Sequence, residues 1–441
     1  MSLDKTREFQ LGANPQTTSI LPEGYVQNQQ DGMDNDERVL VSLGYKQEFK
    51  REFSLWTTFC VSFSILGLLP SFASTMSYGL YYAAAVLAPA GWGPFAAWIT
   101  GWSNWMAQVT AAPSVNYGIS GMVLAAASVM NPGYVPQPYH TFLLTALFMI
   151  LHGILSSMST KWLAVLNSYG STFNIICLLL VIIAIPTGTS NVPRFNSSAE
   201  VWGTIHNRTS YPDGFAVLMS FLSVIWIMSG YDSPFHLSEE CSNANIASPR
   251  AIVMTAGIGG IMGWFLQLVV AYTIRDIDKV IDSDLGQPWA SYLFQVMPIK
   301  LALAILAGTV VCGFSMGQAC MISASRVTYA YSRDDCFPFS NIWKKVNPYT
   351  QTPVNAVWFN CALGVLATLL IFAGDIAMGS ELKPSEMNWT CVVYGGPMTG
   401  IIIWWFVDAR KWFKGPKVNL EHAMLTRDDG EASENSINNF I

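Results

Sequence analysis

The sequence predicts an all-α protein that crosses a membrane many times, and three observations support this fold class. Of the 441 residues, 51% are hydrophobic and only 12% are charged, about half the charged fraction of soluble domains. Several apolar windows reach 18 residues or more, the length at which a helix spans a bilayer. The charges fall in the connecting segments and the tails, and no basic patch suits nucleic acid, so the expected surroundings are a lipid bilayer.

Composition divides the chain into three regions. Residues 1–45 are mostly polar, and Gln, Asn, Pro and Asp dominate most of them, so we expect a disordered cytosolic tail. Residues 46–412 form the membrane domain, and residues 413–441 form a cytosolic C-terminal tail. Lys46, Lys50 and Arg51 directly precede the first span and hold the N-terminus in the cytosol under the positive-inside rule. Residues 1–50 have no apolar core, so no cleavable signal peptide is expected.

The first span is expected at about residues 53–78 and is interrupted near its middle. Gly67 and Pro70 stand there, and a Ser/Thr-rich stretch follows. Glycine weakens a helix, and proline removes a backbone donor and clashes with the preceding turn. Two interpretations remain open, a broken helix or a proline kink filled by hydroxyl groups.

Residues 79–131 also allow two interpretations. One is a single helix from about Pro94 to Met130, bent at Pro113, and the other is a pair of short spans at residues 81–102 and 105–130. The apolar pattern that follows is clearer. Further spans are expected at residues 139–157, 162–185, 215–240, 251–274, 299–324, 354–373 and 392–407.

Charge assigns the sides of the membrane. The expected cytosolic positions are Lys161, Arg250, residues 326–345 and residues 410–417. The connections at residues 131–138, 186–212, 275–298 and 374–391 are then external. Three sequons lie in these connections, at Asn196, Asn207 and Asn388. Because only external sequons receive a glycan, we expect glycosylation at all three.

This topology conflicts with the number of spans. With the N-terminus inside and residues 131–138 outside, an odd number of spans must precede residue 131. A single helix over residues 94–130 gives two spans. Either residues 79–130 hold two spans, or one span is absent from the chain.

The stretch from Asp213 to Arg250 carries the strongest functional signal. Its apolar run, residues 215–228, is about 21 Å long as a helix, whereas a bilayer core is about 30 Å thick. The span must therefore continue through Gly230, Asp232 and Pro234, although an intramembrane carboxylate is costly. Lipid tolerates such a break only where it lines a protein cavity, and broken helices form the sites of secondary transporters. The alternative is an interfacial loop that ends a short helix.

Other classes of function find no support in the sequence. No span contains a cluster of His, Asp and Glu, a nucleophile motif or metal-ligand spacing, so neither an enzyme nor a metal site is expected. Eight cysteines are scattered, without a CxxC, and no cofactor is expected. The glycines of residues 259–263 suit helix packing rather than nucleotide binding. Two unlike broken helices argue against a channel, and no long signalling tail supports a receptor.

Several segments together resemble the fungal amino acid/choline/GABA permeases of the amino acid–polyamine–organocation superfamily. The segments are residues 64–71 (SILGLLPS), 81–89 (YYAAAVLAP), 101–105 (GWSNW), 229–240 (SGYDSPFHLSEE), 324–326 (ASR), 333–334 (RD), 404–405 (WW) and 408–413 (DARKWF). The resemblance covers about residues 37–422. It implies a five-plus-five inverted-repeat transporter of twelve spans and proton-coupled import of a small amino acid or amine such as GABA, with choline or polyamine as alternatives. It places the protein in the plasma membrane, or alternatively the vacuolar membrane.

The chain departs from the family pattern at two places. Between Leu80 and Tyr81 the family has a whole second span, and between Ile376 and Met387 it has two more. The chain is therefore expected to lack about three of the twelve spans, and the first absence explains the conflict in the span count. A truncated isoform that does not transport is the alternative.

The resemblance also assigns site residues. The substrate-binding set is Ile65, Gly67, Leu68, Ser229, Gly230, Tyr231 and Asp232, and the proton-coupling or gating set is Asp232, His236, Glu239 and Glu240. Physically, unwound turns expose N–H groups that suit a carboxylate and carbonyls that suit an ammonium. Asp232 would pair with the substrate cation or carry the proton, and Tyr231 would offer a cation–π contact. Structural hydrogen bonding at the break, and plain interfacial charges at Glu239 and Glu240, are the alternatives.

Overall fold

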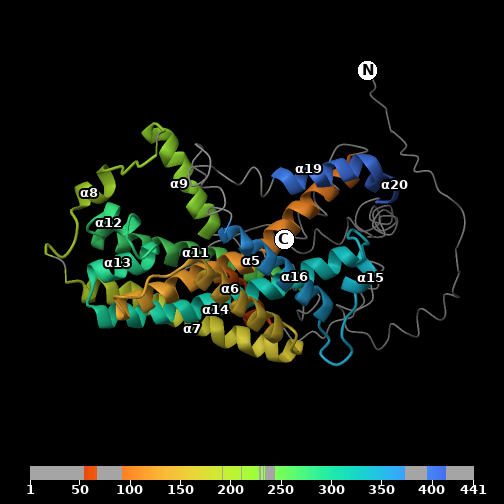
Figure 1. Cartoon of the computed structure of the whole chain (residues 1–441), viewed down its shortest axis with the longest axis horizontal. Helices are drawn as coiled ribbons and strands as arrows, with labels where there is room; N and C mark the ends of the chain where they lie inside the picture. The colour runs from red at the N-terminus through yellow and green to blue at the C-terminus, as the bar shows by residue number, and fades with distance from the viewer. Residues whose placement is uncertain are drawn as a thin grey trace, which may run out of the picture. The chain divides into compact units, whose positions relative to one another are not determined.

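The computed structural model describes residues 54–66, 92–190, 192–209, 211–227, 230–231, 233, 244–372 and 395–413. All of them lie within one compact unit, Gln47–Val418. The secondary structure of these residues is helical, and no strand occurs among them (Figure 1). The predicted all-α class is therefore confirmed, while the two tails lie outside the described residues.

Two long helices, α5 (Gly93–Met130) and α14 (Ile299–Arg333), pack against each other. At 38 and 35 residues they are about 57 and 52 Å long, longer than a bilayer core of about 30 Å. Pro113 lies inside α5 and is buried. Of the two interpretations of residues 79–131, the single helix over residues 94–130 is therefore confirmed, because a buried proline is tolerated where neighbouring helices compensate for it.

Five helices of the described part are long and apolar enough to cross a membrane. They cover Pro138–Ser156 (α6), Thr160–Gly188 (α7), Ile246–Thr273 (within α11, Ala244–Thr273), Ile299–Arg333 (α14) and Val354–Phe372 (α16, Val354–Thr368, with η2, Leu369–Phe372). Each corresponds to an expected span. The multi-pass membrane class is thus supported by the structure as well as by composition.

Helix α14 continues nine residues beyond the predicted end at Ala324. Its last turns are buried because side chains of α5 hold them. Asn104 Nδ2 donates a hydrogen bond to the hydroxyl of Tyr331 at 3.1 Å, and Trp105 Nε1 donates one to Thr328 Oγ1 at 2.9 Å. The apolar pattern ends where these polar contacts begin, so it gave no sign of the extension.

The remaining described helices are shorter. They are α3 (Leu55–Leu66), α8 (Ser198–Gly203), α9 (Asp213–Ile227), α12 (Ile277–Ile281), α13 (Pro288–Val296), α15 (Ser340–Trp343), α19 (Gly395–Trp404), the π-helix η4 (Trp405–Ala409) and α20 (Arg410–Trp412). Helices α12 and α13 lie in a segment that we expected to be a loop. Tyr292 and Leu293 of α13 are buried in the core, so this connection is a folded part of the protein.

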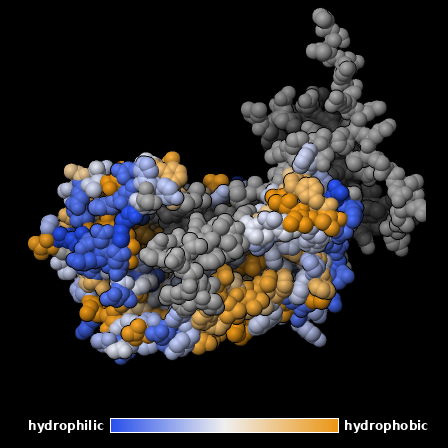
Figure 2. All heavy atoms as spheres, turned by 45° about the horizontal axis from the view of Figure 1, so that its top comes forward, coloured by the Kyte–Doolittle hydropathy of each residue, from blue (hydrophilic) through white to orange (hydrophobic). Residues whose placement is uncertain are grey.

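The helices meet in two large cores and an aromatic cluster. The first core contains buried residues of α3, α5, α7, α11, α12, α13 and α14, and the second contains buried residues of α3, α5, α6, α7, α11, α14 and α16. In the aromatic cluster, Trp98 of α5 lies against Trp405 and Phe413 at the end of the chain's described part. Figure 2 shows hydrophobic residues over much of the helical surface and hydrophilic residues gathered at the end where α8 and α12 lie. This distribution suits a protein whose sides face lipid.

Candidate functional site

The chain turns at Gly230, where the sequence allowed either a broken helix or an interfacial loop that ends a short helix. Helix α9 ends at Ile227 after 15 residues, about 22 Å. Gly230 is buried and has φ +87°, a left-handed conformation that glycine adopts readily and that an α-helix excludes. The amide of Ser233 donates to the carbonyl of Gly230 at 3.2 Å. The chain therefore turns here instead of continuing as a helix.

The two described residues after Gly230 face the protein interior. Tyr231 is half-buried and packs against the first core, to which Phe59 and Cys60 of α3 also belong. Ser233 is only 1% exposed, and its Oγ has no hydrogen-bond partner among the described residues. An unpaired buried hydroxyl costs about 1–3 kcal/mol. Ser233 was not among the predicted site residues, although it belongs to the motif that marked the break.

The other predicted break is only partly described. Ile65 lies in the last turn of α3, which ends at Leu66, directly before the expected interruption at Gly67. The predicted residues Gly67, Leu68, Ser229, Asp232, His236, Glu239 and Glu240 lie outside the described residues. Their roles stay predictions.

Helix α7 presents a polar stripe to α3. Polar residues occupy the middle of the buried face of α7, at Asn167, Ser171 and Asn174, and apolar residues lie on that face on both sides of them. Ser171 Oγ donates a hydrogen bond to the carbonyl of Cys60 in α3. Asn174 lies about one turn further along the same face.

Asn174 is the most unusual residue of this stripe. Its side chain is completely buried, and neither its Oδ1 nor its Nδ2 has a hydrogen-bond partner in the described part of the chain. Thr255 of α11, a helix that packs on both α3 and α7, is also fully buried with an unpaired hydroxyl. Buried polar groups are nearly always paired, and a membrane core supplies little water. Asn174, Thr255 and Ser233 are thus buried polar side chains without a hydrogen-bond partner among the described residues.

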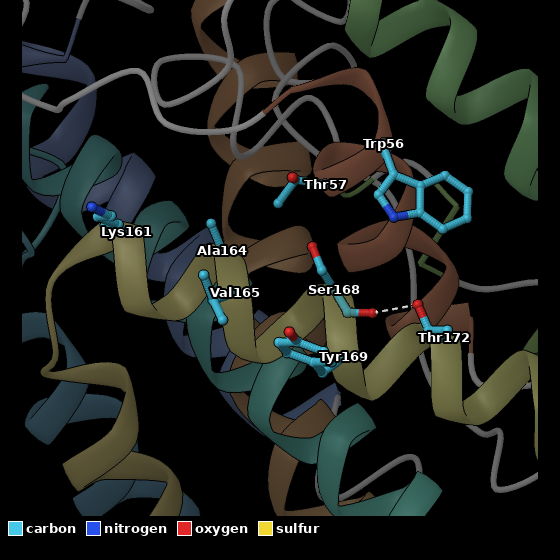
Figure 3. Close-up of a pocket in the computed structure, with 8 residues that line it drawn as sticks. All are labelled: Trp56, Thr57, Lys161, Ala164, Val165, Ser168, Tyr169 and Thr172. Atoms are coloured by element: carbon cyan, nitrogen blue, oxygen red, sulfur yellow. Dashed lines mark hydrogen bonds between the residues drawn. The ribbon is translucent and has the colours of Figure 1, made fainter.

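The cavity drawn in Figure 3 is a different feature. It has a volume of about 510 Å³ and is lined by Trp56 and Thr57 of α3 and by Lys161, Ala164, Val165, Ser168, Tyr169 and Thr172 of α7. These side chains lie mainly on another face of α7 from Asn174. Lys161 is the charged residue among them, so the cavity does not suit an ammonium group. The buried amide of Asn174 does not line this cavity.

A second cluster of buried polar side chains lies where α5, α6 and α14 pack together. Asn116 Nδ2 donates to His152 Nδ1 at 3.2 Å and lies 3.1 Å from Met149 Sδ. The sulfur favours this orientation of the amide, and the bond leaves the imidazole proton on Nε2. Gln318 Nε2 donates to Ser156 Oγ at 2.8 Å. We did not predict this junction, although a histidine within an apolar span was a signal for it.

The gating role predicted for Glu239 and Glu240 needs a cationic partner, which we expect to be Arg250 or Arg326. Arg326 of α14 is 3% exposed, and its Nη1 donates to Ser325 Oγ at 3.0 Å. Arg250, the other predicted partner, is exposed on α11. The two glutamates expected to pair with them lie outside the described residues, so the gate stays a prediction.

Two of the three sequons are described. Asn207 lies in the segment before α9, where its Nδ2 donates to the carbonyl of Tyr211 at 2.7 Å and to Asp213 Oδ1 at 2.9 Å. Asn196 precedes α8 and contacts the end of α11. Asn388 lies outside the described residues. Glycosylation stays a prediction.

The long apolar helices define a multi-pass helical membrane protein, and comparison with known proteins gives its family. The sequence model of the amino acid permease family matches residues 53–417. The chain belongs to this family.

Curated relatives support the assignment. An uncharacterized amino-acid permease of Schizosaccharomyces pombe is 45% identical, over 88% of this chain and 91% of the relative. A Candida albicans protein named "putative polyamine transporter" is 36% identical, over 90% of this chain and 93% of the relative. Among solved structures, a Na⁺-coupled sialic acid symporter matches with a TM-score of 0.41 and 15% identity, over 88% of this chain and 83% of that one, and we draw nothing from so distant a match.

The alignments also bear on the missing spans. The alignment with the Schizosaccharomyces pombe relative is 497 positions long, whereas this chain has 441 residues. The alignment covers 88% of this chain, about 388 residues, so about 109 of its positions have no residue of this chain opposite them. Three spans of about 20 residues each, together with their connecting segments, would account for a difference of this size. The comparison is compatible with a chain that lacks about three spans.

Proposed function

We propose that this permease is a secondary active transporter that imports a small amino acid or amine, with GABA as the expected substrate and a proton as the coupling ion. The observation that carries the proposal is the interrupted helix at Gly230, with φ +87° and the buried Ser233 beside it, in a member of the amino acid permease family. Interrupted helices place unpaired backbone groups at a membrane site. The proposed five-plus-five repeat would pair this break with the one after Leu66.

The chemistry of the site follows from these groups. Free N–H groups at the break attract a substrate carboxylate, and free carbonyls attract an ammonium. Asp232 supplies the negative charge for the ammonium or for the transported proton. Asn174 offers both a donor and an acceptor from the facing helix. Tyr231 closes the site from the side of the first core.

Polyamine import is the alternative that one observation favours. The Candida albicans relative carries that description and is 36% identical to this chain. A polyamine has several ammonium groups and no carboxylate, so it needs more than one negative group along its path. Asp232 with Glu239 and Glu240 would provide them. Choline, with one quaternary ammonium, would depend on aromatic contacts such as that of Tyr231.

An uptake experiment tests the proposal. A permease-deficient fungal strain would express this exact chain, and uptake of labelled GABA, choline and putrescine would be measured with and without a protonophore. The same strain expressing the Schizosaccharomyces pombe relative serves as the positive comparison. The strain without any expressed permease gives the background uptake. Surface labelling would show that each protein reaches the plasma membrane, the proposed location, rather than the vacuolar membrane.

The outcomes separate the alternatives. Protonophore-sensitive uptake of GABA is the expected result, and uptake of putrescine or choline alone would replace GABA as the substrate. Uptake that the protonophore does not reduce would refute proton coupling. Surface expression without uptake of any of the three compounds would favour the non-transporting truncated isoform.

A further inference from the structure

One asparagine of the external segment after α7 is bonded to the end of α11. The backbone amide of Asn196 donates to the carbonyl of Tyr272 at 2.8 Å. Its side-chain Nδ2 donates to the carbonyl of Ala271 at 3.0 Å and to that of Ile274 at 2.6 Å. Asn196 thus contacts three carbonyls that lie 75 to 78 residues further along the chain.

Two of these carbonyls, those of Ala271 and Tyr272, are groups that a helix end leaves unsatisfied, and that of Ile274 directly follows the helix. The last four carbonyls of an α-helix have no partner within the helix, and α11 ends at Thr273. The carbonyl of Val270 is already used by the amide of Ile274, at 2.9 Å. Asn196 therefore acts as a C-cap supplied by a distant part of the chain, and it ties the external end of α7 to that of α11.

The residues around Asn196 reinforce this contact. Arg275 Nη2 donates to the carbonyl of Pro193, and Trp202 Nε1 donates to the hydroxyl of Tyr272 at 3.1 Å. The rings of Trp202 and Trp264 lie 6.1 Å apart. The segment before and within α8 is thus fixed on α11 by several contacts, and the Asn196 cap is part of a built interface.

The cap excludes a glycan at the same atom. A glycan replaces one hydrogen of the asparagine Nδ2, and both hydrogens of Asn196 are used in hydrogen bonds to carbonyls of α11. The residue is also half-buried. Asn207 differs because its partners lie within six residues in an exposed segment, where a local change would free it.

We propose that Asn196 caps α11 instead of carrying a glycan, although Asn196-Ser197-Ser198 reads as an external sequon. Two variants separate the roles. Ser198→Ala destroys the sequon and keeps the amide, at the cost of an exposed contact with the hydroxyl of Tyr272 at 3.1 Å. Asn196→Asp destroys the sequon and also removes both N–H donors while keeping the size of the side chain.

The experiment measures gel mobility before and after endoglycosidase treatment, and the apparent Tm of the purified protein in detergent. Thr209→Ala, which removes the sequon of Asn207, serves as the control for a one-glycan shift. We expect Ser198→Ala to have the mobility of the wild type and a Tm within about 1 °C of it. We expect Asn196→Asp to lose several degrees of Tm without a change in mobility.

Two results would overturn the proposal. A glycan lost in Ser198→Ala would show that Asn196 is modified. Equal Tm values for Asn196→Asp and Ser198→Ala would show that the cap contributes nothing. If Asn196→Asp fails to fold, the mobility of Ser198→Ala still decides the first question, and the failure itself agrees with a structural role.

Discussion

Replacing Gly317 of α14 with alanine tests the packing at the junction of α5, α6 and α14. A Cβ atom built at Gly317 would lie 2.6 Å from His152 Cε1 and 2.8 Å from Asn116 Oδ1. Carbon atoms in good contact are about 3.5–4.0 Å apart, so the imidazole has to move by about 1 Å. That movement stretches the 3.2 Å contact between Asn116 and His152.

The size of the effect follows from three contributions. Overpacking a core costs about 1–3 kcal/mol, and the weakened hydrogen bond costs about 0.5–1.5 kcal/mol. Alanine gains about 0.5–1 kcal/mol over glycine within a helix. The free energy of unfolding should therefore fall by about 1–3 kcal/mol. One kcal/mol corresponds to about 2–4 °C in domains of 150–250 residues and to less in longer chains, so we expect the apparent Tm to fall by about 2–6 °C.

A matched control lies on the same helix. A Cβ atom at Gly308 would lie 3.5 Å from Cys177 Sγ, which is ordinary contact. Gly308→Ala should keep or slightly raise the Tm because only the gain in helix propensity remains. Fluorescence-detected size-exclusion melts in detergent would compare both variants with the wild type. Equal Tm values for the two variants would show that His152 and Asn116 do not occupy the positions described.

Three further predictions concern single side chains. Asn174→Leu should reduce uptake at least tenfold with unchanged surface expression and an unchanged or higher Tm, because leucine removes two unpaired buried atoms; normal uptake would exclude Asn174 from the site. Burial raises the pKa of Tyr292 to about 12, so the folded state favours the neutral phenol. The Tm of the wild type should therefore fall as the pH rises from about 10 to 12. Tyr292→Phe should not show this fall. The backbone amide of Lys279 and its side chain lower the pKa of Asp276 below 3.8, so the carboxylate stabilises the start of α12 above that pH. This stabilisation should be lost as the pH falls through the lowered pKa. The Tm of Asp276→Asn, measured below about pH 4, should lack this dependence on pH.

The sequence located the spans well because lipid demands long apolar helices. It left the region around Pro113 open, since proline breaks a helix in water but is tolerated between packed membrane helices. It ended α14 at Ala324 because the helix beyond carries polar residues such as Thr328, which α5 holds by tertiary contacts. A hydropathy pattern records whether a residue is apolar and says nothing of a partner over 200 positions away.

The candidate site was visible only in part. The glycine and proline of residues 229–234 indicated the break, because glycine allows conformations that a helix excludes and proline cannot donate a helical hydrogen bond. Asn174 and Ser233 were missed, since an asparagine or a serine in a span gives no sign of whether its polar atoms are paired. Asn196 shows the opposite case: a sequon is defined by three residues alone, whereas the cap depends on the end of a helix 75 residues away.

The central claim is that the interrupted helix with Asp232 forms a proton-coupled carrier site, and uptake by Asp232→Asn tests it most directly. Wild type and variant would be expressed in the same permease-deficient cells, with surface amounts matched by labelling, and accumulation of labelled substrate would be followed at pH 5 and pH 7.5. We predict protonophore-sensitive accumulation above the external concentration for the wild type, greater at pH 5, and none for Asp232→Asn. Equal, pH-dependent accumulation by both proteins would contradict the account.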